Sequence, residues 1–146
     1  MNFDMDSSLG FVLNKTALFS KVNFNARIKK FAISPEQWSL LFRIVEQSGL
    51  SQKELSACTY KDQANIGRTV DRLEAKGLLK RAQNEEDRRS ILLYPTDKAI
   101  DLAKKIALVS EQFNNELTEG FAPEERKQLL ALLKKVENNL NNGDIQ

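Results

Sequence analysis

The sequence predicts a mainly α-helical protein with one small β-hairpin. Over most of the 146 residues, apolar side chains recur at steps of three and four, a spacing typical of amphipathic helices. The stretches SPEQ at 34–37 and SQKE at 51–54 have the form of capping boxes, which start helices. Two short runs with strand character flank the charged stretch NEEDRRS at 84–90, and such a pair indicates a hairpin.

The first two helices are predicted from their apolar stripes and caps. The first runs from about Ser8 to Lys30 and is apolar on more than one side. Its main stripe comprises Leu9, Val12, Leu13, Thr16, Phe19 and Val22. The second helix starts with Ser34 as N-cap and ends before Gly49. We expect its Trp38 and Phe42 to belong to the core rather than to an effector cleft.

Two short helices follow closely enough to form a helix-turn-helix. Ser51 caps the first, which extends to about Ala57, and residues 58–61 interrupt the pattern. Asp62 is a suitable N-cap for the second, which ends at Gly77. Its inward positions are Ile66, Val70 and Leu73. A turn of about four residues between two such helices is the outline of this motif.

The hairpin and the last two helices complete the chain. Strands are predicted at 78–81 and 91–94, so NEEDRRS forms the tip of a wing. Thr96 caps a helix that reaches about Glu119, and Pro123 opens the final helix. The inward positions expected on the first of these helices are Ala99, Ala103, Ile106, Val109, Phe113 and Leu117. The whole fold is thus a winged helix-turn-helix flanked by terminal helices.

The composition argues against several classes of protein. The chain contains no His and one Cys, which removes the commonest general base and the commonest transition-metal ligands. We therefore expect that the protein is not an enzyme and has no catalytic residues, no metal site and no cofactor. The amino terminus lacks the positive charge of a signal peptide, so a cytoplasmic protein without membrane contact is expected. Cys58 is expected to be a buried, inert thiol rather than a redox sensor.

The segment ELSACTYKDQANIGRTVDRLEAKGLLKRAQNEEDRRSILLYPTDKA, at 54–99, resembles the MarR family of bacterial transcriptional regulators. RTVDRLEAKGLL at the end of the recognition helix and DRRS at the wing carry the resemblance. It implies a single domain over 1–146, with a winged helix-turn-helix at 33–98 between dimerisation helices at 1–32 and 99–146. It also implies a homodimer on a palindromic operator and a repressor that responds to a small-molecule effector. Gly67, Pro95 and Ala122 depart from the family pattern.

Candidate DNA-binding residues lie on two helices and in the turn between them. The outward face of the recognition helix carries base-reading candidates, because its first turns reach base edges in a major groove. Other positions suit phosphate contact. The base-reading candidates are Gln63 and Arg68, and Ala64 and Gly67 lie on the same outward face. The phosphate candidates are Ser51, Gln52, Lys53, Lys61, Asn65 and Arg72. The alternative is a solvated polar face with ordinary helix caps.

At the wing, Asp87, Arg88 and Arg89 are candidates for minor-groove contact. Narrow A·T-rich minor grooves attract an inserted arginine. Asp87 stands two residues before Arg89, where a carboxylate accepts turn amides or holds a guanidinium by a forked bond. We expect it to aim the arginine rather than to neutralise it. The family's D-x-R pattern falls on the same two residues. The alternative is a solvated charged turn.

The terminal helices carry more apolar side chains than one protomer can cover, which predicts a homodimer. The candidate dimerisation residues are Leu9, Val12, Phe19, Leu129, Leu133, Val136 and Leu140. The favoured function is a dimeric regulator that binds specific double-stranded DNA. The competing hypothesis is a winged helix that serves as a protein-interaction module without binding DNA. Adjacent arginines at the wing tip favour the first.

Overall fold

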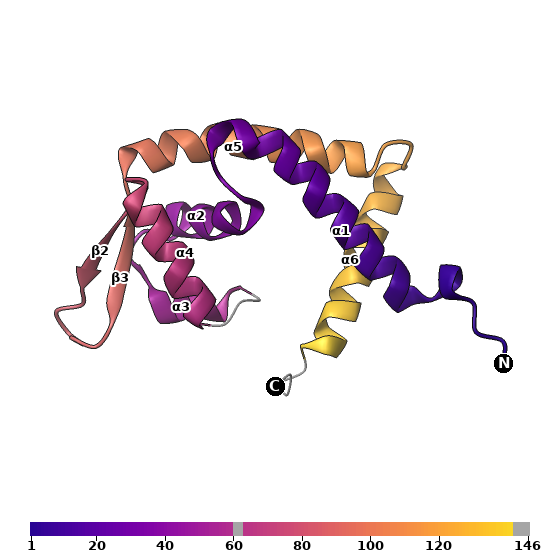
Figure 1. Ribbon diagram of the computed structural model, residues 1–146, viewed down its shortest axis with the longest axis horizontal. Helices are drawn as coiled ribbons and strands as arrows, with labels where there is room; N and C mark the ends of the chain where they lie inside the picture. Colours follow the sequence, from indigo (N-terminus) through magenta and orange to yellow (C-terminus); the bar gives the residue numbers. More distant parts are fainter. Residues whose placement is uncertain (60–62, 142–146) are drawn as a thin grey trace. The chain divides into compact units, whose positions relative to one another are not determined.

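The computed structural model describes residues 1–59 and 63–141. The chain forms two compact units, residues 1–110 and 111–146, and one long helix belongs to both. Figure 1 shows the order of the elements along the chain. No helix in the described part is both long enough and apolar enough to cross a membrane.

The first unit begins with α1 (Leu9–Ile28), preceded and followed by 3₁₀ turns at Met5–Ser7 and Lys29–Phe31. Ala32 then takes the left-handed conformation, with φ 57°, and ends the first helical segment. α2 (Pro35–Glu46) starts at the predicted capping box: the Ser34 hydroxyl accepts from the Gln37 amide, and the Gln37 side chain accepts from the Ser34 amide. This prediction is confirmed, and it shows that the helix start is set locally.

The apolar stripe predicted on α1 lies mostly on the exposed side of the helix. Ile28 is buried, and Phe24 packs against the core, whereas most of the predicted stripe faces solvent. The exposed apolar side chains of α1 are Leu9, Phe11, Val12, Leu18, Phe19 and Val22. Periodicity alone could not assign the inward side, because α1 is apolar on both.

α3 (Gln52–Ala57) and α4 (Gln63–Ala75) form the predicted helix-turn-helix. The Ser51 hydroxyl caps α3 by accepting from the Glu54 amide at 3.0 Å. Ile66, Val70 and Leu73 of α4 are fully buried, as the pattern predicts. Asp62, the predicted N-cap of α4, lies outside the described residues.

A three-stranded antiparallel sheet completes the winged helix. Its strands are β1 (Leu50–Ser51), β2 (Leu79–Gln83) and β3 (Ile91–Pro95), in the order β1-β3-β2. Two of the strands are those predicted: β2 begins one residue later and ends two residues later than expected, and β3 is one residue longer. The two-residue strand β1 was not predicted, because it pairs with the distant β3, Leu50 opposite Leu93. The sheet places the wing tip beyond the free ends of β2 and β3 (Figure 1).

One apolar core joins these elements. Its side chains come from α1, α2, α3, α4, the sheet and the first half of the long helix that follows. The most deeply buried are Ile28, Leu40, Leu41, Ile44, Leu55, Ile66, Val70, Leu73, Leu78, Leu79, Leu93 and Ile106. Trp38 packs against this core, as expected. Phe42 is 36% exposed, so its assignment to the core is wrong.

α5 (Asp97–Leu117) and α6 (Pro123–Leu140) follow the wing. The Thr96 hydroxyl accepts from the Ala99 amide at 3.2 Å, which confirms the predicted cap. Ala99, Ala103, Ile106 and Phe113 are buried, as predicted for inward positions of α5. Leu117, predicted inward as well, is 51% exposed. α6 is exposed along nearly its whole length, and only Val136 is partly buried.

Candidate nucleic-acid interface

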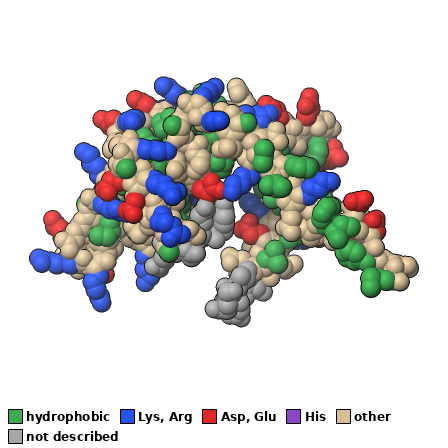
Figure 2. Space-filling model, viewed as in Figure 1, with side chains coloured by type: hydrophobic (Ala, Val, Ile, Leu, Met, Phe, Trp, Pro, Cys, Tyr) green, Lys and Arg blue, Asp and Glu red, His purple; other side chains and the backbone are tan. Residues whose placement is uncertain are grey.

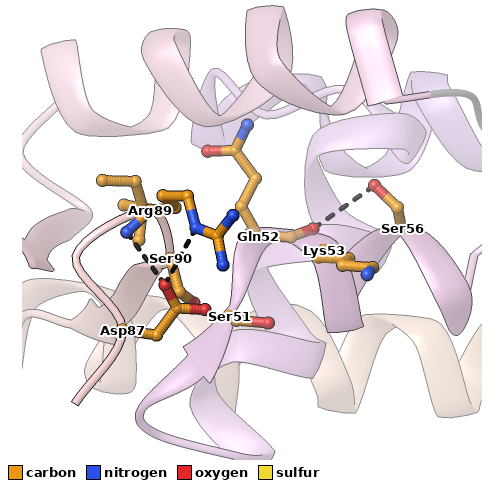
Figure 3. Close-up of a pocket in the computed structure, with 8 residues that line it drawn as sticks. Ser51, Gln52, Lys53, Ser56, Asp87, Arg89 and Ser90 are labelled. Atoms are coloured by element: carbon orange, nitrogen blue, oxygen red, sulfur yellow. Dashed lines mark hydrogen bonds and ion pairs between the residues drawn. The ribbon is translucent and has the colours of Figure 1, made fainter. Parts of the chain in front are cut away.

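A polar groove lies between the start of α3 and the wing, and it brings together candidate residues from both (Figure 3). Its volume is about 540 Å³. The lining residues are Ser51, Gln52, Lys53 and Ser56 from the α3 side and Asp87, Arg89, Ser90 and Ile91 from the wing. Two segments that are 36 positions apart in the sequence, Ser51 and Asp87, thus share one surface.

Three local hydrogen bonds hold the wing turn. The Asp87 carboxylate accepts from the Arg89 amide at 3.1 Å, and the Asp87 carbonyl accepts from the Ser90 amide at 2.9 Å. At the start of the turn, the Asn84 side chain accepts from the Glu86 amide at 3.0 Å. Two of these bonds are accepted by the Asp87 and Asn84 side chains and one by a backbone carbonyl, an arrangement typical of a tight turn.

Asp87 also lies beside the guanidinium of Arg89. Its Oδ1 is 3.5 Å from Arg89 Nε, and the same oxygen accepts the Arg89 amide. The contact uses one carboxylate oxygen, so the forked bond considered as one option does not form. The Arg89 side chain is 95% exposed and extends toward the groove beside α3 (Figure 3). An ion pair this exposed contributes little to stability, and that Asp87 aims the guanidinium stays a prediction.

The outward face of α4 carries exposed Ala64, Arg68 and Arg72. Arg68 donates from its guanidinium to the side-chain oxygen of Asn65 one turn earlier. This bond lays Arg68 along the helix surface, where it is accessible to a ligand. The arrangement fits a face that contacts a polyanion, since both arginines project from the same side.

Gly67 directly precedes Arg68 within α4. A Cβ atom built on Gly67 would lie 3.6 Å from Nε2 of Gln52 on α3, which is an ordinary contact. The fold therefore does not require glycine at this position. Gly67 is half-buried, with the Gln52 amide beside it.

Two candidate residues cannot be placed. Lys61, a phosphate candidate in the turn before α4, lies outside the described residues. The side chain of Gln63, a base-reading candidate at the start of α4, lies outside the described part of the chain too. Ser51 lines the groove, but its side chain is buried and caps α3, so its hydroxyl is already engaged.

Arg81 is a residue of this region that the sequence reasoning did not identify. It lies on β2 and forms ion pairs with Asp71 and Glu74 of α4. The available signal was the pair of acids on the outer side of the recognition helix, spaced three apart and followed by an arginine on the next strand. The partner of Asp71 could not be assigned without the register of β2.

Cys58 corrects another expectation. The thiol, predicted to be buried, is exposed at the C-terminal end of α3. Its Sγ donates to the Leu55 carbonyl at 3.4 Å. The error arose because Cys58 follows the apolar face of a helix that ends one residue earlier. Beyond the end of a helix, its periodicity no longer describes which side faces the core.

The winged helix has almost no excess of positive charge, so any basic surface depends on where its Lys and Arg side chains lie. From Ser51 to Lys98 the chain has ten Lys or Arg and eight Asp or Glu. In Figure 2, Lys and Arg side chains project along the edge formed by the wing, α3 and α4. No cluster of three or more metal-ligating side chains occurs in residues 1–59 and 63–141.

Two helices present apolar faces to solvent. On α1 the exposed face carries Lys15, whose Nζ lies 5.8 and 5.9 Å from the ring centroids of Phe11 and Phe19, and Figure 2 shows hydrophobic side chains along this helix. On α6 the exposed apolar side chains are Leu129, Leu130, Leu132, Leu133 and Leu140. Six of the seven candidate dimerisation residues are exposed, and Val136 is half-buried.

Residues 33–91 match the sequence model of the MarR family. Solved structures extend the similarity across most of the chain. A mutant MarR from E. coli in complex with operator DNA is 26% identical, with a TM-score of 0.84 over 93% of this chain and 98% of that one. A putative MarR family transcriptional regulator from Listeria monocytogenes, complexed with a 26mer DNA, is 26% identical, with a TM-score of 0.85 over 96% and 98%.

A third structure is similar in fold. BpsR from Bordetella bronchiseptica is 23% identical, with a TM-score of 0.88 over 94% of this chain and 99% of that one. The DNA binding of BpsR is regulated by 6-hydroxynicotinic acid. These likenesses agree with a mostly helical winged helix that carries a small antiparallel sheet.

Proposed function

The chain carries a MarR-family winged helix at residues 33–91, and on this basis we propose that it is a dimeric transcriptional regulator that binds specific double-stranded DNA in the cytoplasm. The observation that carries the proposal is the shared surface of α3, α4 and the wing. Lys53 and Arg89 meet in one groove there, and Arg68 projects from the adjacent helix. Relatives with the same fold have been solved with DNA.

In this proposal α4 enters the major groove. Arg68 is the base-reading residue, because a guanidinium donates two parallel bonds to a guanine edge. Arg72, one turn further along the helix, contacts phosphate. Gly67 allows the backbone of α4 to approach the DNA closely, since no side chain stands between them. Ala64 offers apolar contact to a thymine methyl group.

The phosphate backbone is held at the start of α3. Lys53 is exposed there, and the first amides of a helix attract anions. These contacts carry no sequence information, but they fix the register of the protein on the duplex. Gln52, half-buried beside Gly67, supports the same contact from the helix N-terminus.

In this proposal Arg89 at the wing tip enters the minor groove next to the major-groove site. Asp87 orders the turn and directs the guanidinium, so that less side-chain entropy is lost on docking. Arg88 is exposed and available for a neighbouring phosphate. Glu85 and Glu86 stay in water, where they oppose indiscriminate attraction to any duplex.

A second copy of the chain covers the apolar faces of α1 and α6. The exposed side chains on these helices form contiguous helical stripes, which monomeric proteins rarely leave uncovered. A two-fold dimer would present two winged helices to a palindromic site. DNA binding of BpsR is regulated by a small aromatic acid, and we infer that this chain too is a repressor released by a small-molecule effector.

The test is selection of duplexes from a random pool, followed by binding of the enriched and a scrambled duplex at two salt concentrations. Arg68→Ala should lower discrimination by about 1–3 kcal/mol, the value of a bidentate base contact. Lys53→Ala should weaken both duplexes alike and reduce the salt slope by about one. Equal losses on both duplexes would make Arg68 a phosphate ligand. Failure to enrich any duplex would favour a protein-interaction module.

A further inference from the structure

Arg81 on β2 holds two carboxylates of the recognition helix at once. One guanidinium nitrogen, NH2, lies 2.5 Å from Asp71 Oδ1, and the other, NH1, lies 3.2 Å from Glu74 Oε1. Asp71 and Glu74 are three residues apart on α4 and therefore lie on one face of the helix. The side chain joins the recognition helix to the strand that leads into the wing.

The position of Arg81 along β2 suits this connection. α4 ends in a turn at Gly77, with φ +75°, and Leu79 at the start of β2 is buried in the core. Side chains two residues apart on a strand point to the same face, so Arg81 continues the side on which Leu79 lies. Near the turn, β2 is held by the buried side chain of Leu79. Two residues closer to the wing tip, it is held by the ion pairs of Arg81.

β2 needs such a contact because it is an edge strand. It pairs with β3 on one side only, and the wing turn lies beyond its far end. The base of the wing is held by the core residues Leu79 and Leu93 and by the pairing of β3 with β1. Arg81 adds a direct contact between β2 and α4 partway along β2, closer to the wing tip than Leu79.

Stability alone does not account for this arrangement. The side chains of Asp71 and Glu74 are 65% and 43% exposed, and exposed ion pairs contribute little to folding. On a surface that faces phosphates, two carboxylates would also weaken DNA binding. Pairing with Arg81 offsets that repulsion, and it lets the two acids connect α4 to β2.

We propose that Arg81 is a positioning residue for DNA binding: through Asp71 and Glu74 it fixes the angle between the recognition helix and the wing. Arg68 and Arg89 then reach adjacent grooves of one duplex together. This inference rests on the proposed function, because the benefit of a fixed angle is simultaneous contact with DNA.

The first test needs no DNA. Amide hydrogen exchange of the wing, residues 82–91, is compared in the free protein and its variants. Arg81→Gln removes the tie and should speed exchange several-fold, because the wing opens locally. Lys80→Gln, an exposed neighbour with the same charge loss, should leave exchange unchanged. Unaltered exchange in Arg81→Gln would reject the tie.

The second test asks whether Asp71→Asn strengthens or weakens binding to a duplex that the wild-type chain enriches. Asp71→Asn removes a negative charge near DNA, so simple electrostatics predicts tighter binding. Positioning predicts binding about tenfold weaker, comparable to a weakened base contact, with an unchanged salt slope. In the Arg81→Gln background, Asp71→Asn should instead restore part of the lost affinity, since the unpaired acid only repels. Tighter binding by Asp71→Asn alone would overturn the proposal.

A conservative variant separates charge from geometry. Arg81→Lys keeps the charge but cannot hold both carboxylates in a fork, so its affinity should lie between those of wild type and Arg81→Gln. Equal losses in Arg81→Gln and Lys80→Gln, with a smaller salt slope, would make Arg81 a phosphate contact. If the wild-type chain enriches no duplex, the regulator function fails, and the exchange comparison still decides whether Arg81 ties α4 to β2.

Discussion

At the scale of single residues, acids recur beside arginines on the surface proposed to face DNA. Asp87 accompanies Arg89 at the wing, and Asp71 accompanies Arg81 at the recognition helix. A long cationic side chain loses rotamer entropy when it docks, and a neighbouring carboxylate restricts it beforehand. In the interface that we propose, the acids would direct arginines or fix the elements that carry them, at some cost in attraction to phosphate.

The wing pair gives a prediction with an unusual sign. Asp87→Ala should weaken binding to an enriched duplex by about 1–3 kcal/mol, as Arg89→Ala should. The double variant should lose little more than the worse single variant, because the two side chains act as one unit. Titration of labelled duplex with each variant measures the four affinities.

Glu85→Ala is the matched control for Asp87→Ala. Glu85 is an exposed acid of the same turn, and its removal should leave affinity unchanged or slightly higher. If Asp87→Ala also bound more tightly than wild type, the carboxylate would be merely repelling DNA.

Gly67 gives a prediction about stability. Glycine within a helix costs about 1 kcal/mol relative to alanine, and a Cβ at this position meets only Gln52 Nε2, at 3.6 Å. Gly67→Ala should therefore raise the free energy of unfolding by about 1 kcal/mol in urea denaturation. Gly10→Ala, in open space on the first turn of α1, provides a comparison. A destabilised Gly67→Ala protein would show that Gln52 cannot give way, and a stable protein with weaker DNA binding would support close approach of the α4 backbone.

At the scale of elements, the helices begin with caps of unequal quality. α2 has both bonds of a capping box, through Ser34 and Gln37. At the start of α6, Glu125 accepts from the Ala122 amide at 2.8 Å, but Ala122 has no side-chain acceptor to return a bond. One half of the capping box is missing, and an amide of the first turn lacks that partner.

Ala122→Ser should supply it. A serine N-cap stabilises a helix by about 1 kcal/mol relative to alanine, so the midpoint of urea denaturation should rise. Ser34→Ala removes the corresponding bond from α2 and should lower stability by a similar amount, about 1 kcal/mol. Circular dichroism during denaturation compares the two. An unchanged midpoint in Ala122→Ser would mean that α6 does not contribute to the cooperative transition.

Much of the fold could be predicted because helix starts and the inward faces of α4 and α5 depend on neighbours in sequence. Ser34, Ser51 and Thr96 each cap within their own turn. Features set by distant contacts were missed. β1 exists only through pairing with β3, and the partner of Asp71 depends on the path of β2. Within the candidate site, the bond from the Arg89 amide to the Asp87 carboxylate could be predicted, because it is local. The forked bond between Asp87 and the Arg89 guanidinium, the other option, does not form.

At the scale of the whole molecule, net charge is too small to direct the chain to DNA. The formal net charge is +2 for 146 residues, so binding depends on where basic side chains are placed. Two copies of the winged helix would double every phosphate contact. The steep salt dependence of a DNA-binding protein would then report on assembly as well as on the interface.

We predict a homodimer at micromolar concentration. Leu133 on α6 and Phe19 on α1 belong to large exposed apolar faces, and burying them against a second copy is favourable in proportion to the apolar area removed from water. Sedimentation equilibrium should give about twice the protomer mass of 16.6 kDa. Leu133→Asp should shift the protein toward monomer, whereas Gln128→Asp, with the same added charge on an exposed position of α6, should not. A monomeric wild-type chain would contradict the dimer.

The exposed thiol of Cys58 makes this assembly measurable without altering any residue. It is the chain's single cysteine, so a maleimide dye attaches at one defined point on each winged helix. A dimer then carries two identical fluorophores, and energy transfer between them, seen as depolarised emission, changes with their separation. The change in that signal on adding duplex or a candidate small molecule would report a change in the distance between the two winged helices.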